Sequence, residues 1–342
     1  MPVERLEHLV RQSIDGYGSD TEAAVFGTTI AAEIAEAVID HATGTVGPIA
    51  EAVFYRIGVG AVAGLRAQNG EGVVVKVHRW NTSTERLEAV QRVQSHLAQR
   101  GLPAPRPLDP PRALGNGWAT VEELIEAGDA DGHQPSVRRA VAAMLHQFVE
   151  AARSLDGVAV GPPAFIAAPG DPLWGEPHDV RFDFDATARG ADWIDDAAED
   201  ARSTLHSVPA ELSVVGHFDW RTENLGFVDG HIVAIYDWDS LGWADEAVIV
   251  GAAAAQFCAH WRLGHPVASP DEIDLFIQDY QRARQRPFRE HNAERIDAAS
   301  TALIAYGARC EHSDRQLRPD LALADNQGWT GLLRARLGPP HA

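Results

Sequence analysis

Lysine is almost absent from this chain of 342 residues. Only Lys76 is a lysine, and the rest of the 29 basic residues are arginines. Arginine supplies general positive charge, but its planar fork cannot replace a compact ammonium where a site needs one. Lys76 is therefore a candidate functional residue before any motif is considered, with chance retention as the alternative.

Cysteines and long apolar runs are also scarce. Cys258 and Cys310 are the only two cysteines and lie far apart in the sequence, which favours reduced, buried thiols over a disulfide. No apolar run reaches the roughly 18 to 20 residues that span a bilayer. Residues 1–13 contain acidic side chains and lack the apolar core of a signal peptide. We therefore expect a cytoplasmic globular protein.

Positive charge is in the minority. The chain has 49 acidic and 29 basic residues and a formal net charge of −20. This balance argues against nucleic acid or an anionic membrane as a partner. It suits a cationic substrate, although an acidic surface more often serves solubility. With 45% apolar residues, a chain of 342 residues can form two lobes with substantial cores.

The N-terminal third is predicted to contain two helices followed by an antiparallel meander. The helices cover residues 2–16 and 21–44, the second with Asp20 as a possible N-cap and Gly44 as its end. Short β-rich runs follow at 52–57, 62–66 and 73–78. The turn Gly58-Val59-Gly60 between the first two strands can cradle phosphates through its backbone N–H groups, but a plain turn is the more frequent case.

Lys76 lies inside the third of these strands. Its side chain points either to solvent, which is usual for a strand lysine, or into a cleft. A helix that begins at Thr82 or Ser83 and ends at Arg100 carries acidic side chains that could pair with the ammonium. After the helix, residues 118–124 read as another strand.

The second half is predicted to be mainly helical. Helices are expected at 135–155, 193–206, 244–263, 270–286 and 292–307, followed by a tail that contains glycine and proline. Residues 157–192 are rich in glycine, proline and aspartate and have little periodicity. Irregular segments of this length in compact domains are often lids or specificity loops.

One segment of the second half, residues 217–240, places polar side chains at both ends of a predicted hairpin. The strands are 225–228 and 231–236, and the Asp229-Gly230 pair between them is a strong signal for a type I′ turn. Closing the hairpin brings Asn224 and Asp237 within roughly 5 Å of each other. An amide oxygen and a carboxylate at that separation can share one hard cation, with Asp219 on the loop beside it.

The same segment resembles a known family of enzymes. HFDWRTEN followed by YDWDS resembles the H-x-D-x-x-x-x-N pattern, hairpin and D-W-D of the aminoglycoside phosphotransferase and choline kinase-like family. This family is the small-molecule branch of the protein-kinase-like fold. With Lys76 on an upstream strand and G-L-P-A-P after a helix, the resemblance extends over roughly residues 49–249.

The resemblance implies an α+β, two-lobed fold. The N-terminal lobe, residues 1–125, would consist of a helical prefix at 1–48 and a small antiparallel sheet with a helix at 49–125. The larger helical lobe, residues 126–342, would carry the catalytic hairpin at 217–240. ATP would bind between the lobes.

The resemblance also implies roles for the residues of the hairpin segment. Asp219 would be the catalytic base, or the group that orients the substrate hydroxyl, and Asn224 and Asp237 would hold one or two Mg²⁺ ions. His217 and Asp239 would brace the loop. Arg221 stands two residues after the base, where Ser/Thr protein kinases have a lysine that contacts the γ-phosphate, so it either shares that role or is a surface arginine.

In the N-terminal lobe the resemblance implies a nucleotide site. Lys76 would contact the α- and β-phosphates and would be positioned by a helix acid, for which we prefer Glu88 to Glu85. The backbone between Glu122 and Leu124 would hydrogen-bond the adenine. Gly58 and Gly60 would belong to a degenerate glycine-rich loop.

Two departures from the family pattern affect the expected substrate and packing. Phe218 replaces the usual small residue between the histidine and the aspartate, which would narrow the space next to the acceptor hydroxyl. After the D-W-D, the stretch VIVGAAA offers no aspartate to anchor the following helix.

The expected reaction is ATP- and Mg²⁺-dependent phosphorylation of a hydroxyl on a small molecule. The leading substrate is an antibiotic, either aminoglycoside-like or a nucleoside-type natural product, so that the enzyme confers resistance. A metabolic kinase for a sugar, choline or homoserine is the alternative, and a pseudokinase-like nucleotide-binding module is a second one. We expect a monomer or homodimer.

Overall fold

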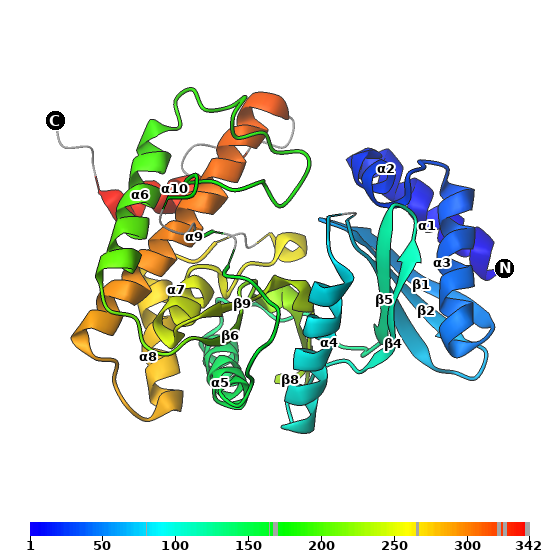
Figure 1. Cartoon of the computed structure of the whole chain (residues 1–342), viewed down its shortest axis with the longest axis horizontal. Helices are drawn as coiled ribbons and strands as arrows, with labels where there is room; N and C mark the ends of the chain where they lie inside the picture. Colours follow the sequence, from blue (N-terminus) through cyan, green and yellow to red (C-terminus); the bar gives the residue numbers. More distant parts are fainter. Residues whose placement is uncertain are drawn as a thin grey trace. The chain divides into compact units, whose positions relative to one another are not determined.

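The computed structural model of the chain divides into two compact units, each described here by itself (Figure 1). It describes residues 1–79, 81–163, 165–166, 170–264, 267–319, 323 and 327–338, without the side chain of Arg262. The first unit is Met1–Glu126 with His178–Arg181, and the second is Ala127–Pro177 with Phe182–Ala342. Within these described ranges, no helix is long and apolar enough to cross a membrane.

The first unit contains a five-stranded antiparallel sheet with the strand order β1-β2-β3-β5-β4. Its strands are β1 Ile49–Ile57, β2 Ala61–Ala67, β3 Gly72–Val77, β4 Pro107–Leu114 and β5 Gly117–Glu123. The predicted meander and the strand over 118–124 are confirmed. The sequence did not predict β4, because PLDPPRAL contains three prolines. Proline cannot donate to a central ladder, but an edge strand such as β4 tolerates it.

Four helices accompany this sheet, namely α1 Pro2–Tyr17, α2 Asp20–Phe26, α3 Ala31–Val46 and α4 Thr84–Gln99. The prediction of one helix over 21–44 was wrong. Gly27 adopts a left-handed conformation with φ 73° and ends α2, and α3 begins only after Ile30. The N-cap position of α2 is Ser19 rather than Asp20. Ser83 caps α4 by accepting a hydrogen bond from the Arg86 N–H at 3.2 Å.

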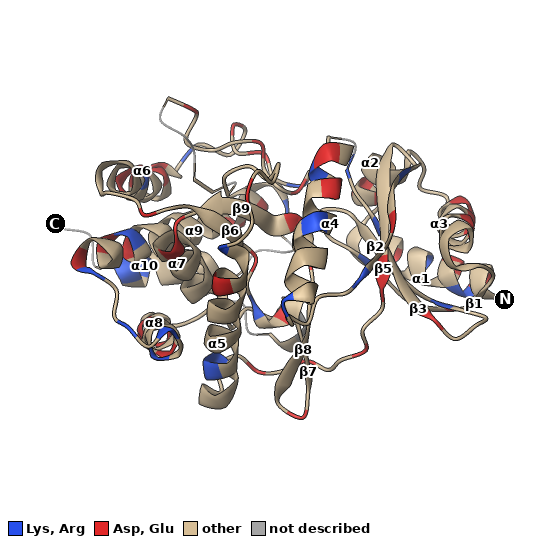
Figure 2. Cartoon of the chain, turned by 60° about the horizontal axis from the view of Figure 1, so that its bottom comes forward, with Lys and Arg blue, Asp and Glu red and all other residues tan. Residues whose placement is uncertain are grey.

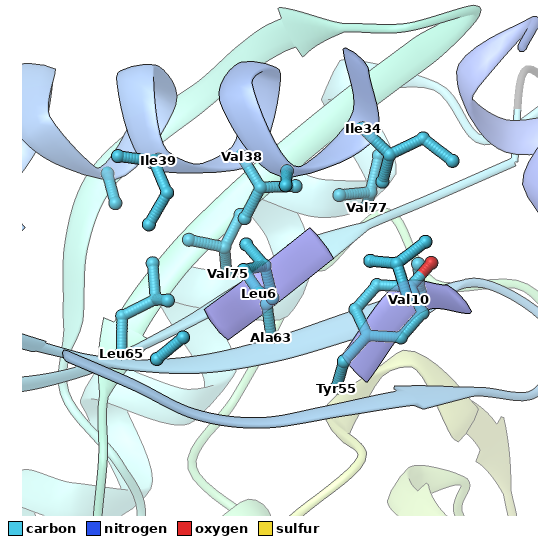
Figure 3. Close-up of a cluster of buried hydrophobic side chains, with 14 of the residues drawn as sticks. Leu6, Val10, Ile34, Val38, Ile39, Tyr55, Ala63, Leu65, Val75 and Val77 are labelled. Atoms are coloured by element: carbon cyan, nitrogen blue, oxygen red, sulfur yellow. The ribbon is translucent and has the colours of Figure 1, made fainter. Parts of the chain in front are cut away.

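The core of the first unit lies between one face of the sheet and the N-terminal helices (Figure 3). Successive strand residues point to opposite faces. On β3, the odd-numbered valines face the helices and Lys76 faces the other way. The labelled members of this core are Leu6, Val10, Ile34, Val38, Ile39, Tyr55, Ala63, Leu65, Val75 and Val77.

The second unit is mainly helical, and its described residues also form two pairs of short strands. The helices are α5 Pro135–Ala152, α6 Asp192–Ser207, α7 Glu246–Gln256, α8 Pro270–Arg284, α9 Glu290–Leu317 and α10 Gly328–Leu337. The strand pairs are β6 Val214–His217 with β9 Leu241–Ala244 and β7 Leu225–Val228 with β8 His231–Ile235. Helix α9 is longer than predicted, and α10 lies in the tail, where the sequence predicted no helix.

Between α5 and α6 the described residues form no helix or strand, which agrees with the irregular segment predicted there. Cys258 and Cys310 are buried thiols, as expected. Burial raises the pKa of the Cys258 thiol well above its ordinary value, so this thiol is not a reactive nucleophile. Charged residues of both signs alternate along α4, whereas α8 begins with acidic residues and has its arginines in the last turn (Figure 2).

Candidate active site

The hairpin of β7 and β8 has the geometry that its sequence predicts. Asp229 and Gly230 both have positive φ, 50° and 77°, as a type I′ turn requires. The Tyr236 N–H donates to the Asn224 carbonyl at 2.8 Å, one step beyond the paired strands. The hairpin therefore brings Asn224 to the same end as Asp237, which follows β8 directly.

Asp219 lies on the loop between β6 and the short helix η1, Thr222–Asn224. The Asn224 side-chain amide donates to Asp219 Oδ2 at 2.7 Å and to the Asp219 main-chain oxygen at 2.9 Å. Arg221 Nε lies 3.1 Å from Asp219 Oδ1. Both oxygens of this half-buried carboxylate are therefore held by neighbours from its own loop.

Arg221 lies among three carboxylates. Its guanidinium contacts Asp219, and its NH2 nitrogen is 4.0 Å from Glu223 Oε2. Burial acts to lower the pKa of Arg221, but Asp219, Glu223 and Asp237 outweigh burial and raise the pKa above its ordinary value. Arg221 is thus a permanent positive charge next to the acids that the resemblance assigns to catalysis and metal binding.

Asp237 has an unusual backbone conformation, with φ 57° and ψ 53°. Aspartate is one of the few residues with a side chain that enters this left-handed region. The Ser240 hydroxyl donates to the Asp237 carbonyl at 3.0 Å and stabilises the turn into η2, Trp238–Ser240. Asp239 lies within η2 and is half-buried. This backbone conformation sets the direction in which the Asp237 side chain leaves the main chain.

His217 connects the loop of Asp219 with the segment of Asp237. Its Nε2 lies 2.9 Å from the Tyr236 carbonyl, and since a carbonyl only accepts, Nε2 carries the proton. Nδ1 is then an acceptor, and the Asp219 N–H donates to it at 3.3 Å. The Ser240 hydroxyl lies 3.1 Å from the same nitrogen. One buried imidazole therefore fixes both segments.

An aromatic cluster lies beneath the loop. The Phe148 ring on α5 is 5.7 Å from Trp220 and 5.9 Å from Trp238, and His217 contacts both tryptophans. Trp220 donates to the Val141 carbonyl at 3.2 Å. Sequence reasoning did not identify this cluster. The signal was present, because one tryptophan follows Asp219 directly and the other stands inside the D-W-D.

The aspartate expected to anchor the helix after the D-W-D is present, and its predicted absence was wrong. Asp245 caps α7 by accepting from the Val248 N–H at 3.3 Å. Its other oxygen accepts from Arg295 Nε at 3.0 Å. Arg295 also donates to the Leu205 carbonyl at 2.7 Å, which ties the end of α6 to the start of α7. Asp245 stands three residues before the stretch VIVGAAA, at the N-cap of α7.

Phe218 is packed inward. Its ring lies 5.8 Å from the Phe165 ring, and a side-chain carbon added at Gly242 would approach it to 3.2 Å. Its main-chain carbonyl accepts from the buried Gln256 amide at 2.7 Å. Phe218 therefore has a packing role, and its expected effect on the acceptor site stays a prediction.

In the first unit, Lys76 pairs with an acid other than the one predicted. Its Nζ lies 3.3 Å from Glu122 Oε1, and both side chains are buried. Gln94 on α4 donates to Glu122 Oε2 at 2.9 Å and to the Pro105 carbonyl at 2.6 Å. Glu88, preferred as the partner from the sequence, is exposed on α4.

The orientation of α4 explains this correction. The residues that α4 buries include Leu87, Val90, Gln94 and Leu97. Glu88 follows Leu87 by one residue, about 100° around the helix, and so lies off this face. Gln94 is a polar residue on the buried face of α4. A polar residue at such a position indicates, from the sequence alone, a polar contact between α4 and the sheet.

The face of the sheet that carries Lys76 has further buried polar groups. His78 Nε2 lies 3.0 Å from the Thr120 hydroxyl, and both residues are buried. The Leu124 N–H, which was expected to bind adenine together with the backbone of Glu122, donates to the Gly72 carbonyl at 2.9 Å. An adenine contact from this segment therefore has to use other backbone groups.

The two glycines of the β1–β2 turn differ. A side-chain carbon at Gly60 would lie 2.4 Å from the Val77 carbonyl, whereas one at Gly58 would meet nothing within 4 Å. Gly60 is required by its close approach to β3, immediately after Lys76. At Gly58, the surrounding structure leaves room for a side chain, so packing does not require glycine there.

A comparison with protein families now identifies the chain. The model of the phosphotransferase enzyme family matches residues 63–298, which is more than half of the chain and includes both Lys76 and Asp237. The protein belongs to this family. It is therefore an enzyme that transfers phosphate, and the family suggested by the sequence motifs is confirmed.

Solved structures confirm the kinase-like, two-lobed α+β fold of this phosphotransferase. The amicoumacin kinase hAmiN in complex with AMP-PNP, Ca²⁺ and Ami has a TM-score of 0.60 at 13% identity, over 83% of this chain and 86% of that one. A thermostable mutant of aminoglycoside phosphotransferase APH(4)-Ia with ADP and hygromycin B has a TM-score of 0.53 at 15% identity, over 82% and 92%.

A third structure extends the comparison to a macrolide enzyme. Macrolide 2'-phosphotransferase MphH from Brachybacterium faecium has a TM-score of 0.50 at 15% identity and covers 90% of this chain and 98% of its own. No curated protein sequence matches the chain at a significant level. At identities this low the structures establish the fold, and the substrate has to be argued from the site.

Proposed function

We propose that this phosphotransferase moves the γ-phosphate of ATP to a hydroxyl group of a small molecule in a Mg²⁺-dependent reaction. The contact of Asp219 with Asn224 and Arg221 on one short loop carries the proposal. A carboxylate held on both oxygens is suited to orient an acceptor hydroxyl and take its proton. Two structurally similar proteins were solved with AMP-PNP or ADP, which supports an adenine nucleotide as the donor.

Asn224 and Asp237 are the residues we assign to Mg²⁺. Asn224 uses its amide nitrogen on Asp219, so its amide oxygen is the atom suited to a cation. In the described residues no three acidic, histidine or cysteine side chains gather as a metal cage. Such a cage is not needed, because Mg²⁺ in nucleotide sites commonly uses one or two protein ligands together with phosphates and water. When bound, the ion neutralises charge on the phosphates.

Lys76 is the residue we assign to the α- and β-phosphates, oriented by Glu122. A buried ammonium held by a carboxylate keeps its charge and its position. We assign the phosphate turn to Gly58 and Gly60. The backbone between Glu122 and Leu124 remains our proposal for adenine, through groups other than the Leu124 N–H.

For the acceptor we propose an antibiotic, aminoglycoside-like or a nucleoside-type natural product, so that the enzyme confers resistance. This is supported by the amicoumacin, aminoglycoside and macrolide kinases of similar fold. A resistance screen of an expressing strain, beside an ADP-release panel of sugars, choline and homoserine, separates this proposal from a metabolic kinase. ATP binding with background ADP release for every acceptor would favour a pseudokinase-like module. The cytoplasmic location and a monomeric or homodimeric state stay predictions.

Replacement of Asp219 tests the mechanism. Asp219→Asn should lower kcat by about 10²–10⁴-fold, since the amide cannot accept the hydroxyl proton, while ATP still binds. Asp237→Ala should instead weaken Mg-ATP binding. Asp229→Asn is a matched control, because it makes the same chemical change in the hairpin turn, where asparagine is equally favoured. Equal, mild effects of the first two variants would contradict the assignment.

Arg221 can be tested in the same assay. We assign its permanent charge to the transferring phosphate, in addition to its contact with Asp219. Arg221→Ala should therefore reduce turnover even at saturating ATP. Unchanged turnover at saturating ATP would show that Arg221 does not act on the transferring phosphate and only contacts Asp219.

A further inference from the structure

Helix α2 contacts two turns of the five-stranded sheet. The Thr21 hydroxyl donates to the Gly58 carbonyl in the β1–β2 turn at 3.4 Å. At its other end, the Val25 carbonyl accepts from the Asn116 N–H in the β4–β5 turn at 2.9 Å. These contacts join the N-terminal helices to the turn that is assigned to the nucleotide phosphates.

A buried acid on α2 is bound to α1 and lies against Tyr55 of β1. Glu22 is fully buried, and its Oε1 accepts from the Ser13 hydroxyl of α1 at 3.4 Å. The Tyr55 hydroxyl interacts with the same carboxyl but lacks the geometry of a full hydrogen bond. Tyr55 lies on β1 three residues before Gly58. A shift of α2 would therefore move the strand that leads into the turn.

The contact of α2 with the β4–β5 turn leaves no room for adjustment. A side-chain carbon at Gly115 would lie 2.6 Å from the Phe26 backbone, and one at Gly27 would lie 2.7 Å from Asn116 Oδ1. Backbones that approach this closely hold each other in one position. The helix is thus fixed at one end and contacts the β1–β2 turn at the other.

The β1–β2 turn is held from two directions. Gly60 lies against the Val77 carbonyl of the strand that carries Lys76, and Gly58 is contacted by Thr21. The residue between them, Val59, is 47% exposed. Without these contacts the turn would have to be ordered when a ligand binds, at a cost in conformational entropy.

We propose that α2 is a brace that pre-orders the β1–β2 turn for the nucleotide phosphates, with Thr21 and Tyr55 as positioning residues. This inference rests on the proposed function, because it assigns the turn to ATP. The N-terminal helices, residues 1–48, would then raise the affinity for nucleotide in addition to covering the sheet. A helix that only covered the sheet would affect stability and leave the nucleotide constants unchanged.

The double variant Thr21→Val with Tyr55→Phe tests the brace, since each change removes one hydroxyl and keeps the shape of the side chain. The KM for ATP should rise about three- to tenfold, as expected for the loss of the Thr21 hydrogen bond and of the polar contact between Tyr55 and Glu22, with kcat and the acceptor KM unchanged. Amide exchange of residues 57–61 without nucleotide should become faster. Thr43→Val, at an exposed position of α3, is the matched control for the extension.

The outcomes separate the two proposals. An unchanged KM for ATP together with unchanged exchange at 57–61 would overturn the brace while leaving the phosphotransferase reaction intact. A wild-type protein that neither binds nor uses ATP would overturn both. Faster exchange with a higher acceptor KM, and no change for ATP, would also contradict the inference, because it would place the turn at the acceptor.

Discussion

The two faces of the five-stranded sheet are built from the same strands and have opposite chemistry. On β3, Val75 points into the apolar core beneath α1 and α3, and Lys76 points to a face with buried polar groups. That second face contains Lys76, His78, Thr120 and Glu122. Because successive side chains of a strand point to opposite faces, one strand can provide both a packing surface and a charged site. The packed face holds the strand in place, and the polar face uses that fixed position.

The largest expected effect concerns the polar face. Lys76→Met keeps the length of the side chain and removes its charge, so kcat/KM should fall by about 10²–10³-fold, the usual cost of losing one electrostatic contact to the reacting group. The protein should also lose stability, because the change leaves Glu122 as a buried carboxylate without its cation. The measurement is steady-state kinetics with urea unfolding of the same preparation. Glu88→Gln is the control and should have wild-type kinetics, since Glu88 is exposed on α4.

A neighbouring residue tests the packed face. Val75 is fully buried, and Val75→Ala removes two methyl groups and leaves a cavity, which should cost about 2 kcal/mol of the free energy of unfolding. The KM for ATP should stay near the wild-type value. A large change in that KM, with little loss of stability, would mean that the two faces do not have separate roles.

The smallest effect is expected at Glu22, where the packed face contains an acid. Burial is the main cause of the raised pKa of Glu22, with Asp20 adding to it, whereas Ser13 and Tyr55 act to lower the pKa. The neutral carboxyl therefore stabilises the fold below the ordinary value of 4.5, and this contribution is lost as pH rises through the folded pKa.

Glu22→Gln removes that titration. Its free energy of unfolding relative to wild type should rise as the pH increases from about 4 to about 7.5, by less than the effect of Val75→Ala. Chemical unfolding of both proteins at each pH measures the difference, so that other titrating groups cancel. A difference that stays constant with pH would show that Glu22 titrates in the folded state as it does in the unfolded one.

The fold was predictable where a local rule decides the conformation. Asp229-Gly230 indicated its hairpin because both residues accept positive φ. The break between α2 and α3 was not predicted, since the apolar spacing continues across Gly27 and only the glycine conformation interrupts it. Strand β4 was hidden by prolines that an edge position tolerates. The β4 miss depends on tertiary position, whereas α2 ends through the preference of Gly27 for positive φ.

The candidate site divides in the same way. Asp219, Asn224 and Asp237 are brought together by one loop and a short hairpin, so their spacing in the chain predicted their grouping. The partner of Lys76 is Glu122, and that contact depends on β3 lying beside β5, which no local pattern reveals. The contact of α2 with the β1–β2 turn is non-local for the same reason.

The scarcity of lysine has a consequence for covalent chemistry. Lys76 carries the only side-chain primary amine of the sequence, and it is 8% exposed beside Glu122. A lysine-acylating reagent therefore reaches Lys76 only when its surroundings open. The rate at which the Lys76 product forms measures how often this part of the sheet opens, without any change to the sequence.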